Sequence, residues 1–167
     1  MKANLALRIV ALSQEDVPGV VAVEPDLSLT EDAVLAEMAR PWARLWVARE
    51  RGGEIVGFAI IWIVAEEVHL LHLATRRDRR RRGVALGLLS RVIQAAREVR
   101  ARGIYLEVRR GNQPAISLYQ KLGFEPQRVR AAYYPDGEDA VEMFVTVESE
   151  KDAISSSAKV PTGQREV

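Results

Sequence analysis

One segment of the sequence concentrates residue types that bind anions. It reads Arg79-Arg80-Arg81-Arg82-Gly83-Val84-Ala85 and lies between an apolar stretch and a long amphipathic stretch. We therefore expect a loop that leads into the first turn of a helix, where free N–H groups and the helix dipole bind pyrophosphate. The chain contains neither G-x-G-x-x-G nor G-x-x-x-x-G-K-S/T. On the residues alone, a solvated basic loop or an RNA-binding patch stays open.

A second candidate is the carboxylate of Glu107, which lies in a short apolar stretch ending at Val108. A carboxylate in such a strand either points to solvent or faces a functional cleft, and the residues alone slightly favour solvent. Two histidines, His69 and His72, lie in an earlier stretch. Their spacing of three predicts opposite faces of a strand, which disfavours a two-histidine metal site. Nothing else in the sequence suggests a metal, although His72 could border a cleft.

Charge is distributed unevenly along the chain. The net charge is only +1, yet residues 76–130 hold fifteen basic residues against four acidic ones, and the remainder carries −10. This pattern predicts that the basic centre binds an anion. The composition, with 48% hydrophobic and 28% charged residues, is typical of a folded globular protein. The absence of cysteine excludes disulfides, thiolate metal sites, Fe–S clusters and cysteine acyl-enzymes, and permits a reducing cytosol.

Length and hydropathy predict one soluble, cytoplasmic domain. The longest apolar run, residues 55–65, is far shorter than the roughly 20 residues of a membrane helix. The N-terminus lacks a long hydrophobic region, so we interpret it as a strand and not a signal peptide. We expect a domain over residues 1–147. Residues 148–167 are polar and contain several serines, so we expect them to be a disordered tail.

The elements that must position these residues follow from the hydrophobic pattern. Helix-start signals occur at residues 13–16, at Thr30 and at Asn112, which we expect to cap a helix. Gly103 and Gly123 are expected at helix C-termini. Strands are predicted over 5–12, 43–49, 54–64, 66–75, 104–108, 124–132 and 140–147, and helices after 13–16 and over 30–39, 83–102 and 113–122.

The order is therefore β-α-α-β-β-β-α-β-α-β-β. The strand–helix–strand unit in the centre predicts a right-handed crossover and a parallel pair of strands. The neighbouring hairpins predict antiparallel pairing elsewhere. The fold class is mixed α/β (α+β), with a mostly antiparallel central sheet, a parallel βαβ centre and flanking helices.

Several blocks in this order resemble the GNAT acetyltransferases. Arg80-x-x-Gly83-x-Ala85 matches their acyl-CoA motif, Q/R-x-x-G-x-G/A, between a strand and a helix. The later blocks resemble the ribosomal-protein-alanine N-acetyltransferase branch, the RimI type. They are Ile104-Tyr105-Leu106-Glu107-Val108-Arg109, Asn112, Ala115-Ile116-Ser117-Leu118-Tyr119-Gln120-Lys121-Leu122-Gly123-Phe124, and Tyr133-Tyr134-Pro135 followed by Asp136-Gly137-Glu138-Asp139-Ala140.

The resemblance implies direct acetyl transfer from acetyl-CoA to an amine in a ternary complex, with no metal. It makes Glu107 the general base and Tyr119 the proton donor to the CoA thiolate. It implies that Tyr133 and Tyr134 contact the acceptor. The residues it implies for the cosubstrate are Leu73, Ala74, Thr75, Arg80, Arg81, Arg82, Gly83, Val84, Ala85, Asn112 and Tyr119.

The acceptor implied by the resemblance is a protein N-terminal amine, including the alanine of a small-subunit ribosomal protein. The sequence departs from the branch at residues 23–29, where close relatives carry Phe-Pro-Trp and this chain has no aromatic residue. An acceptor lysine or small amine therefore stays open, as does a non-catalytic acyl-CoA sensor. A nucleic-acid-binding module is disfavoured, because no aromatic residues are interleaved with the arginines. No membrane partner is expected.

Overall fold

The elements of the computed structural model follow the order that the sequence predicts. The structure describes residues 7–147, so the start of the predicted first strand and the predicted tail at 148–167 lie outside the described residues. Three short 3-10 helices lie at Gln14–Asp16, Pro25–Leu27 and Arg77–Arg79. The other elements are β1 (Arg8–Ala11), α1 (Val17–Val23), α2 (Glu31–Met38), β2 (Ala43–Arg49), β3 (Ile55–Val64), β4 (Glu67–Thr75), α3 (Val84–Glu98), β5 (Gly103–Arg109), α4 (Gln113–Lys121), β6 (Glu125–Arg130) and β7 (Ala140–Thr146).

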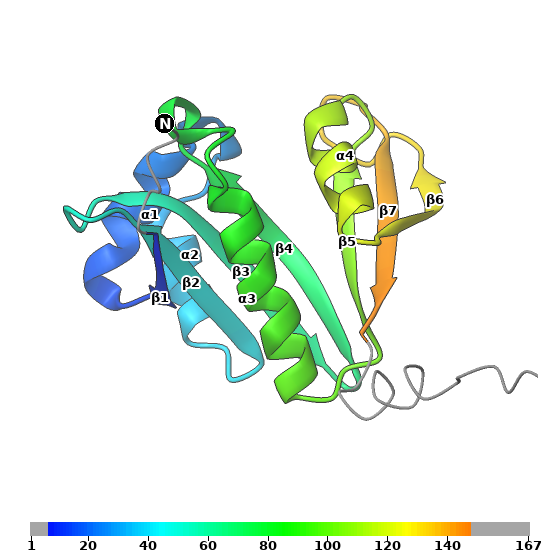
Figure 1. Ribbon diagram of the computed structural model, residues 1–167. Helices are drawn as coiled ribbons and strands as arrows, with labels where there is room; N and C mark the ends of the chain where they lie inside the picture. The colour runs from blue at the N-terminus through cyan, green and yellow to red at the C-terminus, as the bar shows by residue number, and fades with distance from the viewer. Residues whose placement is uncertain (1–6, 148–167) are drawn as a thin grey trace, which may run out of the picture.

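A single sheet organises these elements, with its strands in the order β1-β2-β3-β4-β5-β7-β6. All neighbouring strands are antiparallel except β4 and β5, which run parallel. The crossover between β4 and β5 is made by α3, as Figure 1 shows. The mixed, mostly antiparallel sheet with a parallel βαβ centre is therefore confirmed.

A hydrophobic core lies on each face of the sheet. Successive β3 residues alternate between the two cores, because neighbouring side chains of a strand point to opposite faces. Ile61 packs in the core that contains Leu88 of α3. Ile60 packs in the core that contains Val20 of α1 and Val34 of α2. Helices α3 and α4 thus cover one face, and α1 and α2 cover part of the other.

Helix α3 forms because its apolar residues recur at helical spacing, and these buried residues face the sheet. Its approach to the sheet is close at Gly57, where a Cβ atom would lie 2.7 Å from Val84 Cγ1.

The predicted C-terminus of this helix is wrong. The helix ends at Glu98, and Gly103 is the first residue of β5. A Cβ atom at Gly103 would lie 2.2 Å from the Phe144 ring, so strand packing and not helix capping requires glycine there.

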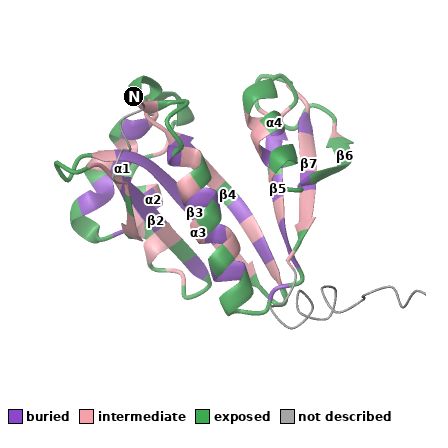
Figure 2. Cartoon of the chain, viewed as in Figure 1, coloured by how far each residue is buried: buried purple, intermediate pink, exposed green. Residues whose placement is uncertain are grey.

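The face opposite α3 and α4 is open over β5, β7 and β6. Leu106 and Val108 point into the core beneath α4, which directs Glu107 to the other face. Strand β6 is exposed along most of its length, as the green colour in Figure 2 shows. This open face carries Glu107, Arg128, Arg130 and Glu142.

Candidate active site

The central feature of the site is the divergence of β4 and β5, which Figure 1 shows. Their parallel pairing covers only four residues of each strand and ends at Leu70 opposite Leu106. Beyond this point β4 continues to Thr75 without pairing to β5. Leu73, Ala74 and Thr75 therefore lie on β4 past the last paired residue, and Glu107 lies just past it on β5.

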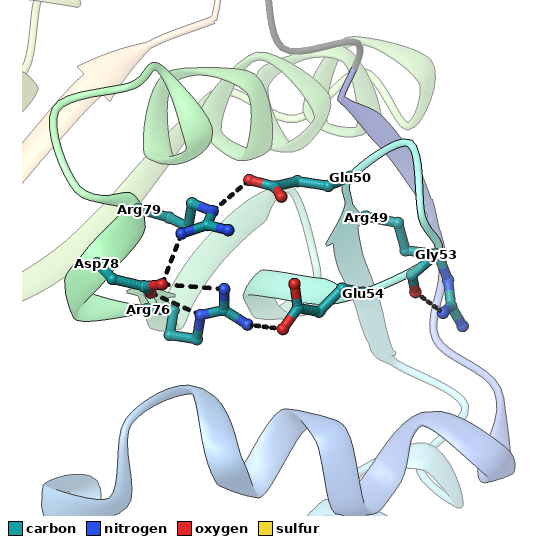
Figure 3. Close-up of polar contacts among 7 residues, drawn as sticks. All are labelled: Arg49, Glu50, Gly53, Glu54, Arg76, Asp78 and Arg79. Atoms are coloured by element: carbon teal, nitrogen blue, oxygen red, sulfur yellow. Dashed lines mark hydrogen bonds and ion pairs between the residues drawn. The ribbon is translucent and has the colours of Figure 1, made fainter.

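Much of the basic loop, residues 76–82, forms ion pairs with carboxylates of the chain itself. Arg79 Nε lies 2.6 Å from Glu50 Oε1, and Arg76 contacts both Asp78 and Glu54 (Figure 3). Glu50 and Glu54 flank the turn between β2 and β3. Hydrogen bonds to Asp78 and Glu54 raise the pKa of Arg76, and the same contacts lower the pKa of both carboxyl groups. Arg76 and Arg79 therefore attach the loop to the β2–β3 hairpin.

Two further arginines attach the loop to the segment between α1 and α2. Arg77 forms an ion pair with Asp26, and Arg80 forms one with Glu24. Arg80 Nε also donates a hydrogen bond to the Thr75 carbonyl oxygen at 3.3 Å. The predicted anion-binding Arg80 therefore lies at the end of β4, but its guanidinium has an acidic partner. The basic centre is more extensively paired within the chain than its net charge indicates.

The remaining part of the predicted anion-binding segment comprises Arg81, Arg82 and the start of α3. Arg81 and Arg82 form no ion pair with any residue in the range 7–147. Gly83 is the N-cap of α3 with φ of +83°, a conformation that glycine adopts without strain. The first helical hydrogen bond runs from Gly87 N to Gly83 O. The N–H groups of residues 84–86 therefore have no acceptor within the helix. Two cations thus adjoin a free helix N-terminus.

Glu107 faces a shallow hollow on the open side of the sheet, with a volume of about 300 Å³. Its side chain is 31% exposed, and its Oε1 lies 3.6 Å from Arg130 Nη2. The residue is exposed and its carboxylate borders this open hollow, so it both meets solvent and lines a concave surface. The hollow is lined by Glu67, His69, Tyr105, Glu107, Arg128, Arg130 and Glu142.

Tyr119 is a buried residue of α4, and its ring lies 5.6 Å from that of Phe124. Burial, with a smaller effect of the nearby Tyr134, raises the pKa of Tyr119 to about 12. The phenol is therefore protonated throughout the neutral range. Asn112 caps the same helix as predicted, since its Oδ1 accepts a hydrogen bond from Ala115 N at 3.3 Å.

Tyr133 and Tyr134 lie in the β6–β7 loop and pack edge to face, with ring centroids 5.2 Å apart. The Arg109 guanidinium lies 4.0 Å from the Tyr134 centroid. Burial raises the pKa of Tyr134, and the charges that act on this phenol include those of Arg109 and Glu107. The structure thus brings Glu107, Tyr119 and Tyr134 into one region.

Ion pairs that the sequence did not predict hold this loop. Arg109 Nη1 lies 2.7 Å from Glu138 Oε2 and 2.8 Å from Asp136 Oδ2. Glu138 Oε1 also accepts a hydrogen bond from Gly111 N at 2.9 Å. The acidic run at 136–139 and the adjacent basic pair at 109–110 were visible as opposite charges. Their pairing depends on β5 and β7 being neighbours.

The prediction that His69 and His72 lie on opposite faces is wrong. His69 pairs with Trp62 and His72 with Ile60, so both histidines point to the face that those two residues share. The reason is a register shift in β4 between these pairs, which adds one residue and restores a common orientation. Burial lowers the pKa of His72, partly opposed by Glu37. In residues 7–147, no three His, Asp or Glu side chains could hold a metal together.

The structure contains, in its described part, no helix long and apolar enough to cross a membrane.

The chain is similar to a known family and to named proteins. The Acetyltransferase (GNAT) family matches residues 8–124. A Bacillus subtilis (strain 168) protein, provisionally named a ribosomal protein bS18-alanine N-acetyltransferase, is 34% identical over 152 residues, covering 88% of this chain and 99% of that protein.

Two more similarities point in the same direction. An N-alpha-acetyltransferase of Sulfurisphaera tokodaii is 36% identical over 120 residues, covering 64% of this chain and 72% of its own. The crystal structure of the ribosomal-protein-S18-alanine N-acetyltransferase from Escherichia coli superposes with a TM-score of 0.78 at 28% identity, covering 84% of this chain and 94% of the other.

Proposed function

The chain belongs to the GNAT family of acetyltransferases and is an acyltransferase, and we propose that its acceptor is the N-terminal α-amine of a protein. Members of this family use acetyl-CoA as cosubstrate. The relatives described above are named for acetylating an N-terminal alanine or an α-amine. These names, at 34% and 36% identity, support an N-terminal amine over a lysine side chain or a small amine.

The single observation that carries the proposal is the position of Glu107 beside the diverging strands. It lies one residue past the last paired residue of β5, opposite the part of β4 that ends at Thr75. An acetyl group held along β4 and an amine held at Glu107 would therefore meet between the two strands. We propose that Leu73, Ala74 and Thr75 contact the acetyl-pantetheine portion of the cosubstrate with their backbone groups.

The free cations of the loop support a seat for the cosubstrate phosphates. Arg81, Arg82 and the N-terminus of α3, from Gly83 to Ala85, present guanidinium and N–H donors together. Arg80 could join them by exchanging its carboxylate partner. Five of the seven charged residues at 76–82 form ion pairs within the chain, and only Arg81 and Arg82 have none with the described residues. The surface therefore suits a compact anion better than an extended nucleic acid.

The residues support direct transfer without a covalent enzyme intermediate. An N-terminal ammonium has a pKa of about 7.7–8.0, so Glu107 can accept its proton directly or through water. The neutral amine attacks the thioester carbonyl carbon, a C–N bond forms, and the C–S bond breaks. The sulfur leaves as a thiolate that takes a proton from the Tyr119 phenol, which its high pKa keeps protonated in the neutral range. The amine nitrogen loses its second proton as the amide forms, and that proton restores the phenol through water. The amide and CoA are the products.

The acceptor position is supported by Tyr133 and Tyr134, whose loop lies beside Glu107. Asn112 caps α4, and a contact with the pantetheine arm is part of the proposal. The segment that carries Phe-Pro-Trp in close relatives is here a short 3-10 helix, Pro25–Leu27, with Glu24 and Asp26 bound to the basic loop. We therefore propose that this segment builds the pocket for the first acceptor side chain differently from the relatives.

A release assay for CoA tests the acceptor. Because the chain has no cysteine, any thiol that appears belongs to CoA. We expect turnover with a lysine-free peptide beginning with alanine. We expect little turnover with a version of this peptide whose N-terminus is acetylated and which contains an internal lysine. We also expect little turnover with a polyamine. Preference for either of the last two acceptors would refute the proposed acceptor. Thermal stabilisation by an oligonucleotide and not by CoA would refute the catalytic assignment.

A further inference from the structure

One arginine connects the proposed base to a second carboxylate. Arg130, the last residue of β6, places Nη2 2.7 Å from Glu142 Oε2 and 3.6 Å from Glu107 Oε1. Its Nε donates a second hydrogen bond to Glu142 Oε2 at 3.2 Å. The Arg130 guanidinium is therefore hydrogen-bonded to Glu142 and lies within ion-pair distance of Glu107.

The two carboxylates would repel each other without this cation. Glu107 of β5 and Glu142 of β7 are directly opposite in the antiparallel register. Like charges in such cross-strand pairs are unfavourable. Burial also disfavours the charge of Glu142, but hydrogen bonds from Arg128 and Arg130 outweigh that cost and lower the pKa of Glu142. Glu142 is thus an ionised anchor for both arginines.

The geometry distinguishes the two acidic partners of Arg130. The Glu142 side chain is 12% exposed and accepts hydrogen bonds from both arginines, whereas the Glu107 side chain is 31% exposed. At 3.6 Å, Nη2 is too distant for a normal hydrogen bond to Glu107 but close enough to stabilise its charge. The Glu107 oxygens stay available for a proton while the cation favours their ionised form.

Other charged and titratable groups also face Glu107. None of the other arginines has an ion pair with it among the residues that the structure describes. Those that line the same hollow or act on the same loop are Glu67 and His69 of β4, Tyr105 and Arg109 of β5, Arg128 of β6, Glu142 of β7, and Tyr133 and Tyr134 of the β6–β7 loop.

We propose that Arg130 is a positioning residue that keeps the Glu107 carboxylate ionised and directed toward the acceptor amine, with Glu142 as its anchor. The inference rests on the proposed role of Glu107 as general base. Arg130 does not contact the reacting atoms in this scheme. It acts through Glu107, and its contribution is largest where protonation of Glu107 would stop the reaction.

The pH dependence of kcat at saturating acceptor tests this inference, because it reports groups in the enzyme–substrate complex. Removing the cation disfavours the ionised carboxylate, so the acidic limb moves to higher pH. For Arg130→Gln we expect an upward shift of about half a pH unit. This corresponds to about threefold lower kcat well below the midpoint, with little change on the plateau. Arg130→Lys retains the charge and should recover part of the difference.

Arg128→Gln is the matched control, since Arg128 contacts Glu142 and not Glu107. Its acidic limb should coincide with that of the wild type. In a Glu107→Gln background, Arg130→Gln should cause no further change in kcat. If Arg130→Gln lowers kcat by the same factor at every pH, or by the same factor with and without Glu107→Gln, then Arg130 only supports the β6–β7 hairpin. If the wild type acetylates another amine, the proposed acceptor is wrong, and the same profiles with that amine still decide the role of Arg130.

Discussion

The Arg109 guanidinium stacks over the Tyr134 ring at 4.0 Å and is held there by Glu138 and Asp136 from the same loop. Arg109 is two residues beyond Glu107 on β5, so the strand that carries the proposed base also fixes the loop that faces it. A cation–π contact of this kind contributes about 0.5–2 kcal/mol. Arg109 therefore contributes directly to the relative position of the base and the loop.

Replacing Arg109 should weaken acceptor binding. In Arg109→Gln, the loop loses its stacking partner and two ion pairs, and we expect KM for the acceptor peptide to rise about fivefold. The dissociation constant for acetyl-CoA should stay within about twofold of wild type, because the β6–β7 loop lies away from the basic loop. Steady-state kinetics and calorimetry separate the two effects. Arg110→Gln is the control, since Arg110 forms an ion pair with Asp139 of the same loop, whereas Arg109 is the residue that stacks on Tyr134. An equal rise in that variant would argue against a specific role for Arg109.

Replacing Glu107 should slow the chemical step. Glu107→Gln keeps the size of the side chain but cannot accept a proton at neutral pH, so kcat should fall about 10²-fold. The melting temperature should change little, because the side chain is partly exposed and its main contact is a single ion pair. Single-turnover rates with saturating acetyl-CoA measure the step directly. A near-normal rate would remove the base role and leave the CoA assignment intact.

Replacing Tyr119 tests the hydroxyl separately from the ring. Tyr119→Phe preserves packing against Phe124 and should leave the melting temperature within about 2 °C, while kcat falls about 10²-fold. Because burial raises the pKa of Tyr119 to about 12, its proton is lost only at higher pH. The wild-type kcat profile should therefore show no alkaline decline from this group up to about pH 10. A decline below that pH that disappears in Tyr119→Phe would contradict the assignment.

We expect Glu24 to compete with the cosubstrate phosphates for Arg80. The Glu24→Gln variant removes the negative charge from the Arg80 guanidinium, so we expect the dissociation constant for CoA to fall about threefold in low salt. Asp26→Asn serves as the comparison, since Asp26 pairs with Arg77 and not Arg80. Titration calorimetry gives both constants. Weaker binding in Glu24→Gln would mean that this ion pair supports the loop more than it competes with the ligand.

Asp16 links stability to pH. Burial disfavours its charge, but hydrogen bonds from Ser13 and the contact with Arg49 outweigh that cost and lower the pKa of Asp16. The ionised form therefore stabilises the fold above the unfolded-state pKa, near 3.8, and the benefit is lost as the pH falls below it. Asp16→Asn should lower the free energy of unfolding at pH 7 by about 1–3 kcal/mol. Urea titrations should show the difference from wild type shrinking between pH 5 and pH 3.

Local patterns were sufficient to predict most of the elements. The caps at Thr30 and Asn112 were read correctly, because a cap acts on its own helix within three residues. Gly103 was misassigned because its requirement comes from Phe144, which is remote in sequence. The common orientation of His69 and His72 could not be read from spacing, since a register shift in β4 depends on pairing with β3.

The candidate site divides in the same way. The basic loop that leads into α3 was predictable, because a basic loop before an amphipathic helix is a local arrangement, and its binding of an anion stays a prediction. The roles of Glu107 and Tyr119 came from resemblance and stay predictions. Arg109 and Arg130 were not singled out, since their partners come from other strands and only the sheet order makes them neighbours.

The uneven distribution of charge along the chain should affect the rate at which the chain folds. Carboxylates from the acidic N-terminal part, such as Glu24 and Glu50, attract the basic centre across tens of residues, and Glu138 and Glu142 attract it from the C-terminal side. Such long-range attraction lowers the effective cost of closing the large loops that a high-contact-order sheet requires. Salt, which screens exposed pairs, should therefore slow refolding more than it lowers the equilibrium stability of the finished sheet.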